Sequence, residues 1–256
     1  MIRTGLLLAA GEGSRLRDAA ASKPLCPVGG VPLIDHALTG MAAAGLTRVI
    51  VVLGYLHGAI EQHLAARDWP LAVETVRVAD HRMPNGVSVL AGASALAGGD
   101  AVLAMCDHLV DPALYVRLAE IGTQGGTTLG IDRRLGHPWV DPEDVTRVAT
   151  DRTSIVAIGK HLEPHDAYDT GVFAIGPALM DALASLDAPS LTEGMRLLAA
   201  RMAAHVVDCG DIDWIDIDDP PALAKAERWI ARRQSAAGSS SNRVTMAFQP
   251  FAVSRT

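Results

Sequence analysis

The chain has 256 residues, 49% of them hydrophobic, which is enough for one large domain with a substantial core. Its formal net charge of −7, without a Lys/Arg-rich cluster, excludes a surface that binds nucleic acid non-specifically. A site for a small anion remains compatible with this charge, because such a site needs only a few cationic side chains.

The cysteines indicate a reducing compartment. Cys26, Cys106 and Cys209 are odd in number and far apart, so they predict neither a disulfide framework nor a metal knuckle. The first strand follows directly on residues 1–3, and no apolar run reaches the length of a membrane span. We therefore expect a cytoplasmic protein without a signal peptide and without membrane insertion.

The first half of the sequence alternates apolar runs with helical patterns. The run RVIVVLG over 48–54 is typical of a strand buried on both faces. We expect strands over 6–8, 48–54, 72–78 and 101–105, and helices over 31–45, 58–66 and 87–96. This order predicts an α/β fold with a Rossmann-like, mostly parallel mixed sheet flanked by helices.

The second half is richer in strands, although helices continue between them. We expect helices over 111–120, 177–186, 191–203 and 220–233, and strands over 127–132, 145–149, 155–159, 171–175, 205–208 and 214–218. Residues 235–256 begin with SAAGSSSN and lack periodicity, which predicts a mostly disordered tail. A docking peptide built on Met246, Phe248 and Phe251 is the alternative for this segment.

The glycine-containing segment after the first strand is typical of a phosphate-binding loop. Backbone N–H groups around Gly11 and Gly13 can approach a polyphosphate closely, and Arg15 and Lys23 can neutralise its charge. The dinucleotide-binding fingerprint would need a third glycine where Leu16 stands, and no G-K-S/T of a Walker loop follows. The sequence therefore favours a nucleoside triphosphate over a dinucleotide.

Asp107 is the first candidate for chemistry outside this loop. It directly follows the expected buried strand over 101–105. In open parallel sheets, ligands bind at the carboxyl ends of the strands, so an acidic residue there is better placed than one on a helix face. Of the nine histidines, His108 is the one beside this candidate.

Several motifs together resemble a known family. The stretch LAAGEGSRL followed by KPL is similar to the signature of the sugar-nucleotidyltransferase superfamily, the nucleotide-diphospho-sugar transferases. MCDH over 105–108, IGKHL over 158–162, DTGVF over 169–173 and WIDID over 214–218 resemble CTP:inositol-1-phosphate cytidylyltransferases. The resemblance covers roughly residues 3–232 and implies a nucleotidyltransferase domain over 1–234, with a strand-rich part for the acceptor.

The resemblance implies how a nucleotide would be bound. The loop amides and Arg15 would hold the β- and γ-phosphates, and Lys23 would stabilise charge at the α-phosphate. The remaining nucleotide-binding positions would contact the base, the ribose and the phosphates; the whole group is Leu8, Ala9, Ala10, Gly11, Gly13, Ser14, Asn85 and Gly86.

The resemblance also implies a Mg²⁺ site. Asp107 and Asp216, with Asp218 as an alternative or third ligand, would hold the ion against the triphosphate and the attacking phosphate. Carboxylate oxygens suit Mg²⁺, which usually takes one or two of them from the protein. For Asp218 a helix cap ahead of Pro220 explains the sequence nearly as well.

Positions on the acceptor side follow from the same likeness. Lys160 would hold the phosphate of the acceptor, and Asp169 would accept hydrogen bonds from ring hydroxyls beside Thr170 and Gly171. Glu193 would be a second polyol contact, unless it forms a capping box with the residues before it. Asp132 is assigned to substrate binding as well.

The resulting hypothesis is Mg²⁺-dependent transfer of CMP from CTP to inositol 1-phosphate, which forms CDP-inositol and pyrophosphate. Other nucleotidyltransferases remain as alternatives: GTP, dTTP or UTP with a cyclitol or hexose 1-phosphate, or CTP with phosphocholine or a phosphonate. A catalytically silent nucleotide-sensing domain is disfavoured, because the charged residues that the likeness implies are present. We expect a monofunctional form, since no membrane domain follows Arg233, and leave open whether it forms a homodimer.

Overall fold

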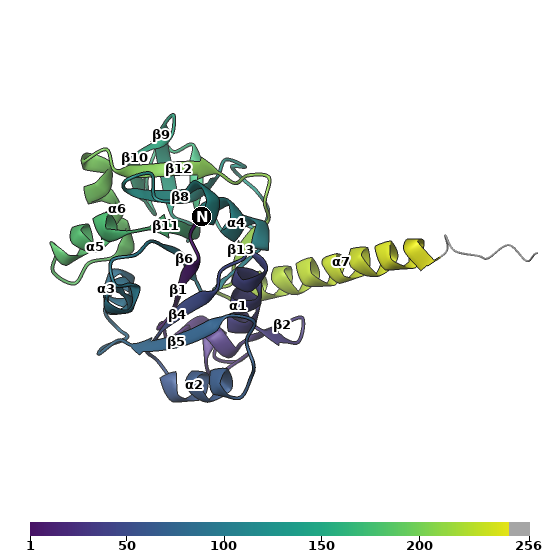
Figure 1. Cartoon of the computed structure of the whole chain (residues 1–256). Coiled ribbons are helices and arrows are strands. Elements are labelled where there is room, and N and C mark those ends of the chain that lie inside the picture. Colours follow the sequence, from purple (N-terminus) through teal and green to yellow (C-terminus); the bar gives the residue numbers. More distant parts are fainter. Residues whose placement is uncertain (246–256) are drawn as a thin grey trace, which may run out of the picture.

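A mixed sheet of nine strands lies at the centre of the described chain (Figure 1). The structure, a computed structural model, describes residues 1–245, with side chains described through residue 235. The strand order is β5-β4-β1-β6-β11-β8-β12-β10-β9. The parallel part consists of β1 (Thr4–Ala9), β4 (Arg48–Leu53), β5 (Ala72–Arg77) and β6 (Ala101–Met105).

The other part of the sheet is mostly antiparallel. The strand β11 pairs antiparallel with β6 and β8, whereas β12 runs parallel to β8. Its strands are β8 (Thr127–Asp132), β9 (Arg147–Asp151), β10 (Ser154–Gly159), β11 (Ala167–Ile175) and β12 (Ala204–Asp208). The predicted α/β fold with a strand-rich second part is confirmed.

Helices cover both faces of the sheet. Residues of α1 (Leu33–Ala43), α2 (His57–Ala65) and α4 (Pro112–Ile121) share one buried apolar cluster with the sheet. On the opposite face, α3 (Asn85–Leu96), α5 (Pro177–Ala184) and α6 (Leu191–Ala200) share a second cluster (Figure 1). Residues of β1 and β4 alternate between the two clusters, as expected of strands buried on both faces.

A third, smaller cluster anchors the segments that carry the site. Two short ribbons lie here, β7 (His108–Val110) with β13 (Trp214–Asp216), and β2 (Pro27–Val28) with β3 (Val31–Pro32). Leu16 of the helical turn η1 (Ser14–Leu16) packs with Leu109 and Ile215 in this cluster. The turn η2 (Lys23–Leu25) precedes β2. The third cluster therefore fixes the glycine loop against β7 and β13.

The last helix, α7 (Pro220–Thr245), is longer than predicted and projects away from the sheet (Figure 1). Residues 235–245 are helical, whereas the sequence predicts that a disordered tail begins there. No proline interrupts this segment, so the helix can continue into its serine-rich part. The docking peptide considered for Met246, Phe248 and Phe251 lies outside the described residues. Among residues 1–245, no helix has the length and apolar content needed to cross a bilayer.

Candidate active site

The glycine loop and Asp107 lie at the same edge of the sheet. The strands β1 and β6 are parallel neighbours, with Leu8 opposite Met105, so both chains leave the sheet side by side. The backbone N–H of Cys106 donates to the carbonyl of Leu8 over 3.0 Å and extends this pairing. The carboxyl ends of the strands therefore bring together two segments that are about a hundred residues apart, as the sequence predicts.

Lys23 is buried beneath the glycine loop between two carboxylates. Its Nζ lies 2.8 Å from Asp107 Oδ2 and also contacts the carboxylate of Asp218. The loop can close over it because Gly13 has a φ of 60° and no side chain; a Cβ there would lie 2.4 Å from Lys23 Cβ. Burial disfavours the charged amine, but Asp107 and Asp218 outweigh this effect and raise the pKa of Lys23.

Asp107, His108 and Asp216 form a cluster of metal-ligating groups. One ligand atom of each lies within 4.8 Å of the others. His108 Nδ1 is 2.9 Å from Asp107 Oδ1 and 3.8 Å from Asp216 Oδ1. Pairing of β7 with β13 places Asp216 opposite His108, and the N–H of Ile217 donates to the carbonyl of Asp107 over 3.0 Å.

The electrostatics of this cluster fit a divalent cation. Burial raises the pKa of Asp216 to about 7, and repulsion from Asp107 and Asp218 adds to the effect although His108 opposes it. Burial lowers the pKa of His108, but Asp216 and Asp107 outweigh it and raise the value to about 9. Asp216 Oδ1 is buried without a hydrogen-bond partner among the described residues. A free buried carboxylate oxygen beside a second carboxylate suits Mg²⁺.

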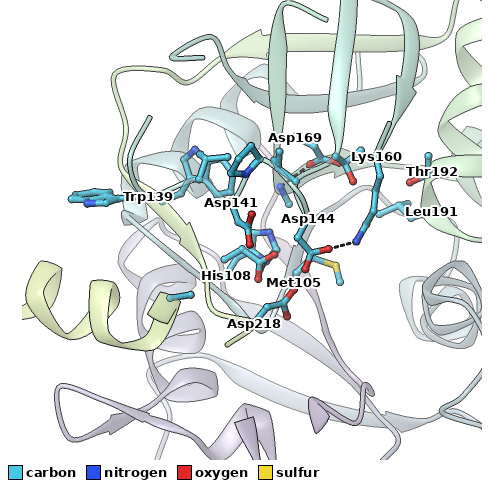
Figure 2. A pocket seen from close by; sticks show the side chains of 18 of the residues that line it. Met105, His108, Trp139, Asp141, Asp144, Lys160, Asp169, Leu191, Thr192 and Asp218 are labelled. Carbon is cyan, nitrogen blue, oxygen red and sulfur yellow. Dashed lines mark hydrogen bonds and ion pairs between the residues drawn. The ribbon is translucent and has the colours of Figure 1, made fainter. Parts of the chain in front are cut away.

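Two adjoining cavities meet at these carboxylates. The first, of about 240 Å³, is lined by the end of β1, the glycine loop, Lys23 and Asp107. The second, of about 400 Å³, is shown in Figure 2 and is lined by Lys160, Asp169 and His108, among others. Asp218 lines both cavities. The arrangement can hold a polyphosphate on one side and a second ligand on the other, with cations between them.

Most predicted site residues lie at these cavities. The first is lined by Leu8, Ala9, Gly11, Gly13, Ser14, Arg15, Lys23, Asp107 and Asp218. The second is lined by Asn85, Lys160, Asp169, Gly171, Asp216 and Asp218. Asn85 also accepts a hydrogen bond from the N–H of Leu191 over 2.8 Å, so it holds the start of α6 as well.

Asp132 is not part of either cavity, which corrects the prediction that it binds substrate. Its side chain is 0% exposed and pairs with Arg134, with an N–O distance of 2.9 Å. The indole Nε1 of Trp214 donates to the same carboxylate over 2.9 Å. At the end of β8 the carboxylate therefore has a structural role, because a buried charge needs such partners.

Four other predicted positions have structural contacts. Glu193 forms a capping box with Ser190 at the start of α6, which is the structural alternative that the sequence offers for this residue. Its side chain also lines a separate groove beside Lys160. Thr170 is buried and donates to the carbonyl of Gly130 over 2.7 Å. Neither Ala10 nor Gly86 lines the two cavities. The carbonyl of Ala10 accepts a hydrogen bond from Tyr55 N. Because Gly86 has no side chain, α3 can pack closely against the backbone at Pro189.

Asp144 is a site residue that sequence analysis missed. It lies on the loop between β8 and β9, and its Oδ2 is 2.8 Å from Nη2 of Arg15. Its Oδ1 contacts Nζ of Lys160, as Figure 2 shows. The surrounding DPED run over 141–144 is typical of a turn, and nothing in the sequence indicates that it faces a lysine 16 residues later.

Gly171 allows the turn at Asp169 to approach His108. Its φ is 75°, and a Cβ would lie 2.6 Å from Cδ2 and 2.7 Å from Nε2 of the imidazole. We predict that Gly171→Ala lowers the free energy of unfolding by about 2 kcal/mol or more, from strain plus the clash. Gly125→Ala is the matched control, because Gly125 has a φ of 80° and its Cβ would meet no described atom within 4 Å.

Denaturant unfolding of both variants measures this difference. Gly125→Ala should show only the conformational cost, about 1 kcal/mol. If the two variants lose equal stability, close packing of Gly171 against His108 is not what the turn requires.

The side chain of Asp169, a half-buried residue, accepts a hydrogen bond from Gly171 N at Oδ1 over 2.7 Å. Burial raises the pKa of Asp169 to about 6, above that of an unfolded Asp. The contribution of the protonated form to stability is therefore complete below about pH 4 and is lost as the pH rises through 6.

We predict that Asp169→Asn, which keeps the acceptor oxygen without the charge, is more stable than the wild type by about 1–2 kcal/mol at pH 8. The gap should shrink towards pH 4. Chemical denaturation at pH 8, 6 and 4 tests this. A variant that is less stable at pH 8 would show that the buried carboxylate is not destabilising.

The strand ends, the glycine loop and the opposing carboxylates define a domain of the nucleotidyltransferase class. The chain belongs to the family described as "MobA-like NTP transferase domain", whose pattern matches residues 5–202.

Two relatives are similar in sequence to most of this chain. The chain is 31% identical over 229 residues to "Bifunctional IPC transferase and DIPP synthase" of Rubrobacter xylanophilus, which covers 88% of this chain and 51% of the relative. It is 26% identical over 237 residues to "CMP-5'-(3-aminopropyl)phosphonate synthase" of Streptomyces rubellomurinus, covering 87% and 38% of the two chains. The chain thus spans about half the length of the first relative and less of the second.

A solved structure shares the fold. The inositol-1-phosphate CTP transferase from T. maritima superposes with a TM-score of 0.78 at 22% sequence identity, over 88% of this chain and 96% of that one. A UDP-glucose pyrophosphorylase complexed with UDP-glucose superposes with a TM-score of 0.75 at 15% identity, over 91% of this chain and 100% of that one. At these identities the likeness establishes the fold alone.

Proposed function

We propose that this chain transfers CMP from CTP to the phosphate of inositol 1-phosphate, forming CDP-inositol and releasing pyrophosphate. The observation that carries the proposal is the pair of adjoining cavities that share Asp218, one lined by the glycine loop and the other by Lys160 and Asp169. The relatives named for IPC transfer and the T. maritima inositol-1-phosphate CTP transferase support this choice of substrates.

The chemistry would be a direct displacement at the α-phosphorus. An oxygen of the acceptor phosphate forms a bond to this phosphorus as the bond to the bridging oxygen of pyrophosphate breaks. The attacking oxygen is already anionic near neutral pH, so the step needs no general base. Catalysis would therefore consist of positioning and charge neutralisation.

Each cation would have a separate role in this displacement. Loop amides and Arg15 would bind the β- and γ-phosphates and stabilise the leaving pyrophosphate. Lys23, held between Asp107 and Asp218, would face the α-phosphate, where charge develops. Lys160, which lines the larger cavity, would bind the acceptor phosphate.

Asp107 and Asp216 are the residues that would hold Mg²⁺, which would neutralise phosphate charge in the site. Asp216 is favoured over Asp218 because it clusters with Asp107 and His108 and because its buried Oδ1 has no hydrogen-bond partner among the described residues. Carboxylates are the hard oxygen ligands that this ion prefers.

A second acceptor class also suits the larger cavity. Its lining includes carboxylates that could accept hydrogen bonds from a polyol or pair with an ammonium group: Asp169, Asp216, Asp218 and Asp219. An aminoalkyl phosphonate or phosphocholine is therefore the second candidate. The name of the Streptomyces relative points in the same direction.

A substrate panel tests both candidates. The purified chain is incubated with Mg²⁺ and CTP, UTP, GTP or dTTP, each with inositol 1-phosphate, phosphocholine, 3-aminopropylphosphonate or glucose 1-phosphate, and pyrophosphate is measured. We expect the highest kcat/KM for CTP with inositol 1-phosphate. A preference for an amine-bearing acceptor would support the second candidate, and no release from any pair would contradict both.

A further inference from the structure

Asp144 connects the two cavities although it belongs to a loop outside the glycine motif and the strand ends. Arg15 lines the nucleotide-side cavity, and Lys160 lines the other one. Both cations contact Asp144, one on each carboxylate oxygen. Its carboxylate is thus the direct link between a cation of the triphosphate loop and the cation on the acceptor side; Figure 2 shows its contact with Lys160.

This link extends into a chain of alternating charges across the site. Arg15 also contacts Asp218 over 2.7 Å, and Asp218 contacts Lys23. In order, the chain of contacts is Lys160, Asp144, Arg15, Asp218, Lys23, Asp107 and His108. Each carboxylate in this chain lies between two cationic groups, so the loss of one carboxylate removes a contact from the groups on both sides.

The exposed fractions of these side chains indicate that their ion pairs position the cations rather than stabilise the fold. Arg15 is 54% exposed and Lys160 is 56% exposed, whereas Asp144 is 20% exposed. Ion pairs that involve such exposed cations contribute little to folding. Long cationic side chains in solvent do sample many rotamers, and ordering them costs entropy when a ligand binds. A fixed carboxylate between them reduces that cost in advance.

The backbone around Asp144 is held in place. The N–H of Val145 donates to the carbonyl of Asp141 over 3.0 Å, and Asp141 Oδ1 accepts from Glu143 N over 2.9 Å. Arg147 donates to the carbonyl of Pro142 over 3.1 Å. Val145 packs against the apolar cluster of α1 and α4. The loop can therefore act as a support for the two cations.

We propose that Asp144 is a positioning residue of the transfer reaction: its carboxylate orients Arg15 towards the triphosphate and Lys160 towards the acceptor phosphate. The inference rests on the proposed function. Asp144 acts through the two cations and does not bind substrate itself. The loss of Asp144 should therefore affect the kinetics of both substrates.

Asp144→Asn tests this proposal, with Asp141→Asn as the charge-matched control. Asp141 lines the same cavity on the same loop, and an Asn there keeps the oxygen that accepts from Glu143 N. Both changes remove one negative charge near the phosphates, which alone would strengthen the binding of anionic substrates. We expect Asp144→Asn instead to raise the KM of both substrates and to lower kcat/KM by about tenfold, and Asp144→Glu to recover most of the loss.

The outcomes separate the two proposals. Steady-state kinetics use the nucleotide and acceptor that the wild type turns over best, and thermal unfolding establishes that the variants fold. Equal kinetics for Asp144→Asn and Asp141→Asn, or a lower KM in both, would overturn the positioning role. A wild type that turns over no pair at all would instead contradict the proposed function.

Discussion

Replacing Asp107 with Asn should reduce kcat by at least about a hundredfold while the protein remains folded. Asp107 contacts Lys23 and His108 and is one of the two carboxylates proposed to hold Mg²⁺. The amide keeps the size of the side chain but loses the charge, so it would bind the metal poorly and would leave Lys23 with Asp218 as its remaining carboxylate partner. The effect should therefore appear mainly in kcat and in the Mg²⁺ dependence.

Pyrophosphate release over a range of Mg²⁺ concentrations measures this effect, and circular dichroism establishes folding. Asp151→Asn is the control, because Asp151 is exposed at the end of β9, away from both cavities. Turnover of Asp107→Asn within twofold of the wild type would remove Asp107 from the catalytic site.

Lys23→Met should reduce both activity and stability. The variant lacks the cation proposed to face the α-phosphate, and it leaves Asp107 and Asp218 without the amine between them. Removing one member of a buried ion pair typically costs 3–5 kcal/mol. Because each of these carboxylates is about a quarter exposed, we expect a smaller loss, about 2 kcal/mol at pH 7.5.

The contributions of Lys23 and Asp107 to stability are both expected to be complete at pH 7.5. The pKa of Lys23 is raised, so its contribution is complete below the unfolded value near 10.4 and is lost only at higher pH. The pKa of Asp107 is lowered, chiefly because Lys23 overcomes the effect of burial, so its contribution is complete above about pH 4. Both contributions are present at pH 7.5.

Urea unfolding compared with Arg82→Met tests the stability change. Arg82 is an exposed cation whose ion-pair partner among the described residues is its near neighbour Asp80, so its loss should change the free energy of unfolding by less than about 0.5 kcal/mol. If Lys23→Met is as stable as Arg82→Met, the buried amine does not hold the two carboxylates together. If it keeps wild-type kcat, Lys23 does not act at the α-phosphate.

The parallel half of the fold could be predicted because its signals are local. Continuous buried apolar runs identify β1, β4 and β6, and the rule that ligands bind at strand ends points to Asp107. The same rule failed at Asp132, because a buried carboxylate at a strand end can equally well pair with a neighbouring cation. Only the position of Arg134 decides between these outcomes.

Individual side-chain contacts between distant segments could not be predicted from local sequence patterns. The pairing of β7 with β13, which places Asp216 beside His108, joins residues that no local pattern relates. Asp144 contacts Arg15, which lies 129 residues earlier in the chain. Its own surroundings are typical of an ordinary turn. The sequence thus indicates which groups carry charge, whereas the tertiary fold decides which of them meet.

The most direct measurement of the central proposal is ³¹P NMR of a reaction that contains the chain, CTP, inositol 1-phosphate and Mg²⁺. We predict that the signals of CTP and of the phosphomonoester decrease together, while those of free pyrophosphate and of a new diphosphate diester appear in equal amounts. Release of pyrophosphate without a diester, or an unchanged spectrum under conditions in which another nucleotide and acceptor do react, would contradict cytidylyl transfer to inositol 1-phosphate.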